Sequence, residues 1–265
     1  MTTTLPATTA ALPAVPARRG TRLIQPVYLR TELRRLLRNR RSVIIALVMP
    51  AAFFLLFGTA TAYRTESAGH GNVTGYIMIS MALYGTLLAT TSGGASVSVE
   101  RAQGWSRQLR LTSLRPAAYV VTKVVVAMVF GLASMAMTVL VGRAAGAQID
   151  GPRLVACVAI AWVGSAVFAA FGLFMGYLLP AENVMQILGP VLAVLAFAGG
   201  LFTPLNGGVF ATIARFMPTY GLAELTRAPL VGAAPSVWAY VNVIAWGALF
   251  ASGAAWRFRR DTARV

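Results

Sequence analysis

Residues 95–119, ASVSVERAQGWSRQLRLTSLRPAAY, place five charged residues between two long apolar runs. Gly104 favours a bend, and Pro116 is suited to the first turn of the helix that follows. Trp105 and Leu109 are about one helical turn apart, and arginines flank them. The stretch therefore predicts a short amphipathic helix between two longer helices. Residues 96–116, which contain it, are here called the connector.

The rest of the chain has the composition of a helical membrane protein. Of its 265 residues, 57% are hydrophobic and 11% are charged, whereas soluble domains contain about 25% charged residues. A helix needs roughly 20 apolar residues to cross the hydrocarbon of a bilayer. The six predicted spans are residues 42–62, 76–97, 118–141, 155–179, 185–202 and 237–256. The third contains Lys123, whose ammonium group is expected to reach toward the lipid head groups.

The positions of the basic residues set the expected orientation. The chain has 23 basic and 7 acidic residues, and 18 of the basic ones lie in segments 18–41, 100–123 and 257–264. Basic segments beside spans stay on the cytoplasmic side, so both termini and the connector are predicted to be cytoplasmic. The net charge of +16 does not indicate nucleic-acid binding, because the arginines adjoin spans and face anionic lipid instead.

The remaining segments complete an all-α membrane protein. Residues 22–41 place leucines and arginines at helical spacing, which favours an amphipathic helix in the head-group plane over a basic flank without defined geometry. Prolines divide residues 203–236 into one or two short external helices, re-entrant from the outer interface. The predicted parts are a disordered cytoplasmic arm (1–21), the interface helix (22–41), a six-span domain (42–256) containing the connector (96–116) and the external helices (203–236), and a cytoplasmic tail (257–265).

Two local patterns concern the packing of the spans. Pro50 removes one hydrogen bond within the first span, and a membrane helix tolerates this when a neighbour satisfies the freed carbonyl group. Gly172 and Gly176 form a small-xxx-small pattern, which permits another helix to approach closely. That helix belongs either to the same chain or to a second copy.

The sequence contains no motif for catalysis. It lacks a G-x-x-x-x-G-K-[ST] phosphate loop, an H-E-x-x-H or C-x-x-C motif and paired acidic residues for magnesium pyrophosphate. No catalytic residue, metal site or bound cofactor is therefore predicted, and His70 is read as a solvated loop residue. The centres of the spans also lack acidic residues, which disfavours proton coupling. If the protein moves a substrate, we expect a partner to supply the energy.

The connector resembles the cytoplasmic loop of type-2 ABC (ABC-2) exporter permeases, including drug-exporter permeases of the daunorubicin-resistance type. The matching residues are Glu100-Arg101, Gly104-Trp105, Leu109, Leu111 to Pro116 and Thr122-Lys123. Residues 216–227 are similar to the same family's segment ahead of the last span, and the likeness extends over nearly the whole chain. The connector departs from the family pattern at Trp105 and Ser113, where threonine and proline are usual.

The resemblance implies a half-transporter, a membrane subunit that pairs with a second copy as a homodimer and binds two cytoplasmic ABC ATPase subunits. ATP and magnesium would then bind to the ATPase and not to this chain. Residues 96–116 would form the coupling helix that transmits ATP-driven closure to the spans, the alternative being a basic loop that rests on lipid head groups. The residues expected to make the coupling contact are Glu100, Arg101, Gly104, Trp105, Arg107, Leu109, Arg110 and Leu111.

The same resemblance places the substrate path at the interface between the two copies, along spans 1, 2 and 5. Candidate path residues, each of which also suits ordinary helix packing, are Phe53, Phe54, Tyr84, Thr86, Thr90 and Phe197. A path that is apolar and poor in acids suits a drug-like or lipid-like amphiphile better than an ion.

The predicted function is therefore ATP-driven export of such an amphiphile across a bacterial cytoplasmic membrane. The bacterial assignment follows the use of arginine over lysine, together with abundant alanine, which indicates a GC-rich genome. Export of a polysaccharide or another lipid-linked glycan, a proton-driven carrier and a membrane-embedded lipid-modifying enzyme are the alternatives.

Overall fold

A computed structural model describes residues 26–104, 116–202 and 207–263. Within these ranges the chain is helical, with two isolated β-bridges and no strand. The elements are α1 (Pro26–Arg38), α2 (Arg40–Val43), the π-helical turn η1 (Ile44–Val48), α3 (Met49–Gly58), α4 (Thr61–Thr65), α5 (Val73–Ala102), α7 (Pro116–Ala144), α8 (Gly151–Gly164), α9 (Ala166–Leu178), α10 (Ala181–Ala198), α11 (Gly208–Ala214), α12 (Tyr220–Val231) and α13 (Val237–Ala263).

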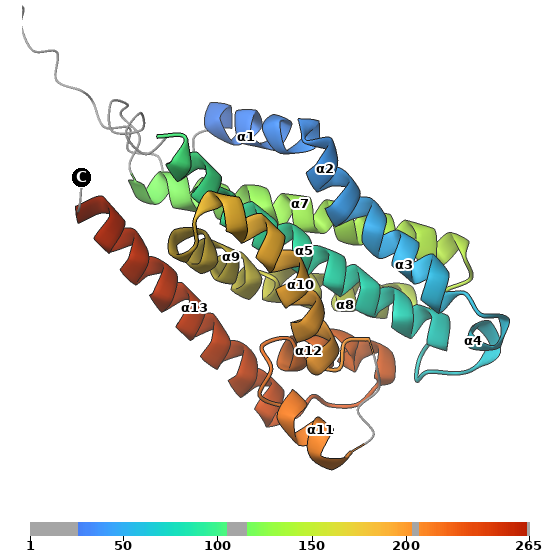
Figure 1. Cartoon of the computed structure of the whole chain (residues 1–265). Coiled ribbons are helices and arrows are strands. Elements are labelled where there is room, and N and C mark those ends of the chain that lie inside the picture. The colour runs from blue at the N-terminus through green and yellow to red at the C-terminus, as the bar shows by residue number, and fades with distance from the viewer. Residues whose placement is uncertain (1–25, 105–115, 203–206, 264–265) are drawn as a thin grey trace, which may run out of the picture.

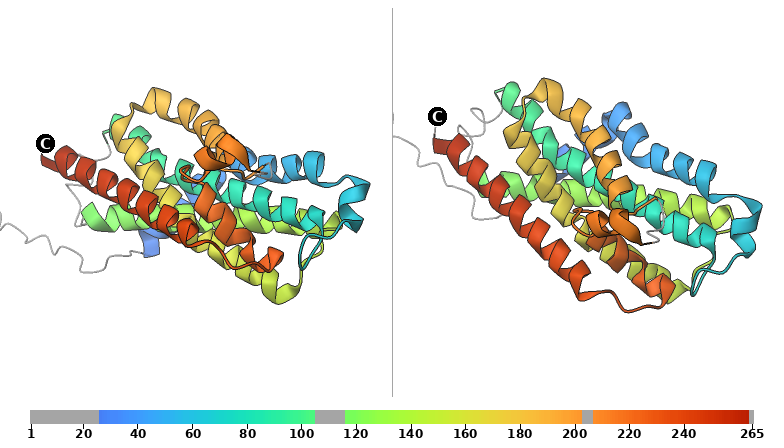
Figure 2. Two further views of the ribbon diagram at one scale, coloured as in Figure 1. Left: turned by 90° about the horizontal axis from the view of Figure 1, so that it is seen from below. Right: turned by 60° about the horizontal axis from the view of Figure 1, so that its bottom comes forward.

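The long helices form one bundle around α5. In the most apolar 18-residue stretch of α5, 83% is buried within the chain. The corresponding share is 22% in α10 and in α13. In Figure 1, α1 and the C-terminal end of α13 lie at one end of the bundle, and α4 and α11 lie at the other. Both views of Figure 2 show α13 along one flank of the bundle and α3 along another. α5 is therefore the central helix against which most of the others pack.

Five of the six predicted spans are matched by helical segments long and apolar enough to cross a membrane. These segments, among the described residues, are Val73–Ala102, Ala117–Ala144, Gly151–Leu178, Ala181–Ala198 and Val237–Arg260. The first predicted span, 42–62, contains a shorter apolar helix, Ile44–Gly58, and α4 follows it as a separate element. The count of six therefore stays a prediction.

The shorter helix shows how Pro50 is accommodated. Proline has no backbone N–H to donate to the carbonyl four residues earlier, which belongs to Ala46. The backbone widens into η1 just before α3, where the Met49 N–H bonds to the Ile44 carbonyl oxygen. The Ser134 hydroxyl of α7 donates to the Ala46 carbonyl oxygen, which confirms that a neighbour satisfies the freed group.

Glycines let α9 approach α5 closely. A Cβ atom added to Gly172 would lie 2.1 Å from the Thr91 carbonyl oxygen, and one added to Gly176 would lie 3.0 Å from the Ala95 carbonyl oxygen. The small-xxx-small pattern therefore packs within the chain, against α5. The contact places the C-terminal end of α9 beside the C-terminal end of α5.

Segments outside the spans agree with the prediction in part. α1 lies within the predicted interface helix, 22–41, and α11 and α12 are short helices within 203–236. Their position in the membrane interface stays a prediction. The predicted disordered arm, residues 1–21, and the connector residues 105–115 lie outside the described residues.

Candidate functional site

A buried cluster of charged side chains joins three helices at the end of the bundle that carries α1. Lys123 of α7 places its Nζ atom 2.5 Å from Glu32 Oε2 of α1 and in contact with Glu100 Oε1 of α5. Arg35 of α1 donates from Nη1 to the same Glu100 oxygen at 2.8 Å. Lys123 is 3% exposed, so the expectation that its ammonium group reaches lipid head groups is wrong: it is paired inside the protein.

Helix geometry brings these groups together. Tyr119 and Lys123 lie about one turn apart on α7 and therefore share a face, and the Tyr119 hydroxyl donates to Glu100 Oε2. Glu32 and Arg35 are three residues apart on α1, with 3.6 Å between Glu32 Oε1 and Arg35 Nη1. The two carboxylates balance the two cations, and the oxygens of Glu100 accept hydrogen bonds from both neighbouring helices.

Such a cluster fixes geometry more than it stabilises the fold. The cost of taking ions out of water roughly offsets their attraction, whereas removing one partner of a buried pair costs about 3–5 kcal/mol. α5 ends within the connector, at Ala102, and α7 begins at the connector's last residue, Pro116. The cluster therefore joins α1 to both ends of the connector.

The described part of the connector matches the prediction in part: the helix of the second span continues to Ala102, beyond its predicted end at residue 97, whereas the break at Gly104 and the helix start at Pro116 agree. α5 ends at Ala102, Gly104 has a φ of 72°, and α7 begins at Pro116. This φ lies in the left-handed region that favours glycine, which confirms the predicted bend. The other residues assigned to the coupling contact lie outside the described residues: Trp105, Arg107, Leu109, Arg110 and Leu111.

Arg101 contacts α9. Its Nη1 atom donates to the Tyr177 carbonyl oxygen at 3.2 Å, and its guanidinium carbon lies 5.6 Å from the centre of the Tyr177 ring. Because the last carbonyl groups of a helix have no partner within that helix, Arg101 satisfies one of them. Contact of Arg101 or Glu100 with another protein stays a prediction.

Four of the six candidate path residues are buried within the chain. Phe54, Tyr84, Thr86 and Thr90 are all at most 5% exposed. The Thr86 hydroxyl donates to the Ala82 and Gly131 carbonyl oxygens, and the Thr90 hydroxyl donates to the Thr86 carbonyl oxygen. These contacts are those of packed helices, and a role in a substrate path stays a prediction.

The remaining candidates lie nearer the surface. Phe53 is partly buried, and Phe197 of α10 is 55% exposed. Phe202 brings Phe197 and Tyr84 together, since its ring centre lies 5.7 Å from that of Phe197 and 5.0 Å from that of Tyr84. Sequence reasoning missed Phe202, which follows α10 after a turn and carries no periodic signal.

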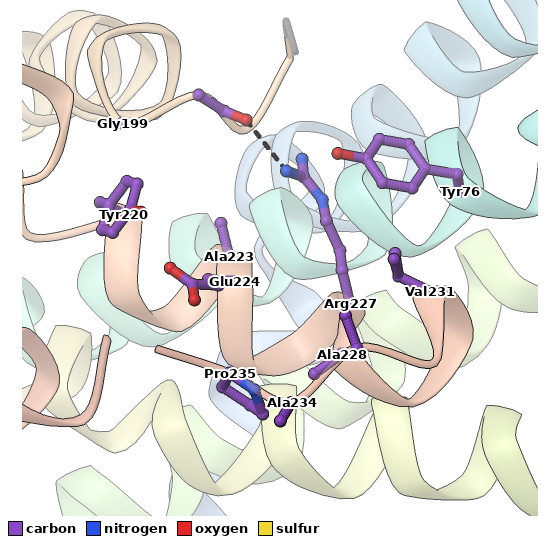
Figure 3. A pocket seen from close by; sticks show the side chains of 12 residues that line it. Tyr76, Gly199, Tyr220, Ala223, Glu224, Arg227, Ala228, Val231, Ala234 and Pro235 are labelled. Atoms are coloured by element: carbon purple, nitrogen blue, oxygen red, sulfur yellow. Dashed lines mark hydrogen bonds between the residues drawn. The ribbon is translucent and has the colours of Figure 1, made fainter. Parts of the chain in front are cut away.

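A second polar site lies on α12, around Arg227. Its Nε and Nη2 atoms donate to the Ser80 hydroxyl at 3.1 and 2.8 Å. Nη1 donates to the Gly200 carbonyl oxygen at 3.0 Å, and Nη2 also donates to that of Leu201. Figure 3 shows the guanidinium extending from α12 toward the Tyr76 ring. Burial lowers the pKa of Arg227 from its ordinary value. The sequence marked Arg227 only as an external arginine.

Arg227 lines a cavity of about 260 Å³ between α12, the end of α10 and α5. Burial raises the pKa of Tyr220 at the same cavity, nearby Glu224 adds to the shift, and Arg215 opposes it. The lining residues are Tyr76, Gly199, Gly200, Tyr220, Ala223, Glu224, Arg227, Ala228, Val231, Ala233, Ala234 and Pro235. No group of three or more metal-ligating side chains occurs among the described residues.

The fold is that of a multi-pass helical membrane protein, in which a buried charged cluster joins α1, α5 and α7. The model of the ABC-2 type transporter family matches residues 27–231, and the chain belongs to this family. Its members are transport permeases, so the chain is a membrane subunit, and ATP hydrolysis occurs on a separate ATPase subunit with which it associates.

A curated relative agrees with this assignment. The chain is 25% identical over 228 residues to YvfS of Bacillus subtilis (strain 168), a protein provisionally named as a transport permease. The alignment covers 83% of this chain and 90% of that protein. The likeness therefore extends over nearly the whole length of both chains.

Proposed function

We propose that the chain is the membrane subunit of an ATP-driven exporter that moves a drug-like or lipid-like amphiphile outward. Two copies would form the path, and each would bind one ATPase subunit through residues 96–116. The charge asymmetry supports a bacterial cytoplasmic membrane with both termini inside. ATP and magnesium would bind to the ATPase alone.

The observation that carries the proposal is the buried cluster around Glu100. It ties both ends of the connector to α1, and one of those ends is the last turn of the central helix. A force applied to the connector would therefore move α1, α5 and α7 as one unit. Because α5 packs against several spans, this movement would reach the interior of the bundle.

The proposal predicts export that depends on the ATPase. The permease is purified with its partner ATPase and reconstituted into inside-out vesicles. Uptake of a fluorescent amphiphilic cation and of a tail-labelled lipid is then measured. We expect uptake with ATP and none with a non-hydrolysable analogue, because closure of the ATPase supplies the energy.

Two controls separate the alternatives. Vesicles with the permease alone and an imposed proton gradient should show no uptake, and uptake there would indicate a proton-driven carrier. A lipid-linked oligosaccharide is offered in parallel. If ATP drives uptake of the oligosaccharide but of neither amphiphile, the proposed class of substrate is wrong.

A further inference from the structure

Two opposite charges on α12 line the outer cavity without pairing with each other. Glu224 and Arg227 are three residues apart, a spacing that places them on one face of a helix and commonly allows an ion pair. No ion-pair contact within 4.0 Å joins them in the described structure. Figure 3 shows their side chains pointing different ways, Glu224 toward Tyr220 and Arg227 toward Tyr76 and α10.

Within the described residues, Arg227 has no acidic side chain paired with it. It is 9% exposed, and its hydrogen-bond partners are the neutral groups of Ser80, Gly200 and Leu201. A guanidinium has five N–H groups, and the four hydrogen bonds formed with described residues leave one N–H of Nη1 without a partner among them. Nη1 is also the nitrogen that bonds to Gly200, a residue of the cavity wall.

Glu224 has an unused acceptor. Its Oε1 atom accepts a hydrogen bond from the Ser236 backbone N–H at 2.6 Å, which holds the loop that closes the cavity. Its Oε2 atom is buried and has no hydrogen-bond partner among the described residues. The nearby Tyr220 side chain interacts with the carboxylate closely enough for Glu224 to raise the pKa of Tyr220. A buried carboxylate oxygen without a donor is costly, so this atom is suited to a donor supplied by a ligand.

The rest of the cavity wall is apolar or aromatic. Ala228, Val231, Ala234 and Pro235 form one side, and the rings of Tyr76 and Tyr220 face it. Arg215, an exposed residue outside the cavity lining, is a further cation near Tyr220. The site therefore combines a fixed cation, a separate carboxylate and an apolar wall.

We propose that this cavity binds the head group of a zwitterionic amphiphile, with a phosphate or carboxylate at Arg227 and a primary ammonium group at Glu224. A simple anion would leave Glu224 Oε2 without a hydrogen-bond donor and would place a second negative charge beside it. A simple cation would leave Arg227 without a counter-charge. The proposal rests on the proposed function only in assigning the cavity to the outer side of the membrane.

The test is lipid binding to the purified full-length chain in a non-ionic detergent, measured by native mass spectrometry. Phosphatidylethanolamine is compared with phosphatidylcholine and phosphatidylglycerol of the same acyl chains. We expect phosphatidylethanolamine to bind about tenfold more tightly, because phosphatidylcholine lacks the N–H donor and phosphatidylglycerol lacks the cation. Free glycerophosphoethanolamine, which has no acyl chains, should bind much more weakly than the lipid.

Variants locate the binding. Glu224→Gln keeps the shape of the side chain and should remove the preference for phosphatidylethanolamine over phosphatidylcholine. Ala234→Trp fills the cavity without altering either charged residue and should weaken binding of phosphatidylethanolamine about tenfold or more. The matched controls are Asp150→Asn and Arg153→Gln, since both residues lie outside the cavity lining and Arg153 still contacts α12 through the Pro229 carbonyl oxygen.

Three outcomes would overturn the proposal. They are equal binding of the three lipids, unchanged binding by Ala234→Trp, and equal binding of the lipid and its free head group. The assay contains no ATPase and measures no transport. Failure here therefore leaves ATP-driven export untouched, and failure of export leaves the binding result valid.

Discussion

Lys123→Met is expected to lower the stability of the protein by about 3–5 kcal/mol and to abolish ATP-driven export. The substitution keeps the length and apolar stem of the side chain but leaves Glu32 and Glu100 buried with only Arg35 as a counter-charge. The variant loses the side chain of α7 that pairs with both carboxylates, so α1, α5 and α7 are held together less firmly. The measurements are the thermal unfolding midpoint in detergent and ATP-dependent uptake in vesicles.

A double variant separates stability from coupling. Adding Glu100→Gln to Lys123→Met leaves Glu32 and Arg35 as a balanced pair. The double variant should therefore lose less stability than the sum of the losses of the two single variants. Export should stay low, because the charged link between α5 and α7 is absent. Arg143→Met, at the exposed opposite end of α7, is the control. Normal export by Lys123→Met would show that the cluster is only structural.

The second large effect is expected at the connector. Trp105→Ala combined with Arg107→Glu should reduce co-purification of the ATPase at least tenfold and remove ATP-dependent export. Buried tryptophan and arginine residues commonly dominate protein interfaces, and truncation of one such residue costs about 2 kcal/mol or more. The measurements are the ratio of ATPase to permease after affinity purification, and uptake in vesicles.

The control for this variant is Arg64→Glu, which reverses the charge of an exposed arginine on α4, a segment predicted to be external. It should leave both complex formation and export unchanged. The thermal unfolding midpoint of the connector variant is measured alongside, and we expect it to match that of the unchanged protein. If the connector variant still co-purifies with the ATPase and still exports, the proposed coupling role of residues 96–116 is wrong.

The sequence was sufficient for the features that depend on local pattern. Apolar length located the segments α5, α7, α8 with α9, α10 and α13. The residue types Gly104 and Pro116 marked the bend within the connector and the start of α7. The exception was the first span, where the helix is shorter than the apolar run. Apolar composition indicates which segment can cross the membrane, but it does not predict that the helix in 42–62 ends at Gly58.

The polar sites could not be predicted because they join residues far apart in the chain. Lys123 looked like a lysine at the membrane surface, and nothing in its neighbourhood indicates Glu32, which lies 91 positions earlier. Arg227 looked like an external arginine, yet its partners are a hydroxyl group on α5 and backbone carbonyl groups after α10. Every residue has a backbone carbonyl group, so the sequence does not indicate which of these groups will accept a hydrogen bond from Arg227.

The measurement that tests the coupling role most directly is site-specific crosslinking from the connector to the ATPase. Cys157, the one native cysteine, is fully buried, so a photoreactive maleimide is expected to label Trp105→Cys selectively, and Arg64→Cys, on the predicted external side, is the control. The account predicts a crosslink between position 105 and the ATPase whose yield changes on ATP binding, and none from position 64. Crosslinks from position 105 to lipid alone, in a complex that still hydrolyses ATP and exports, would contradict it.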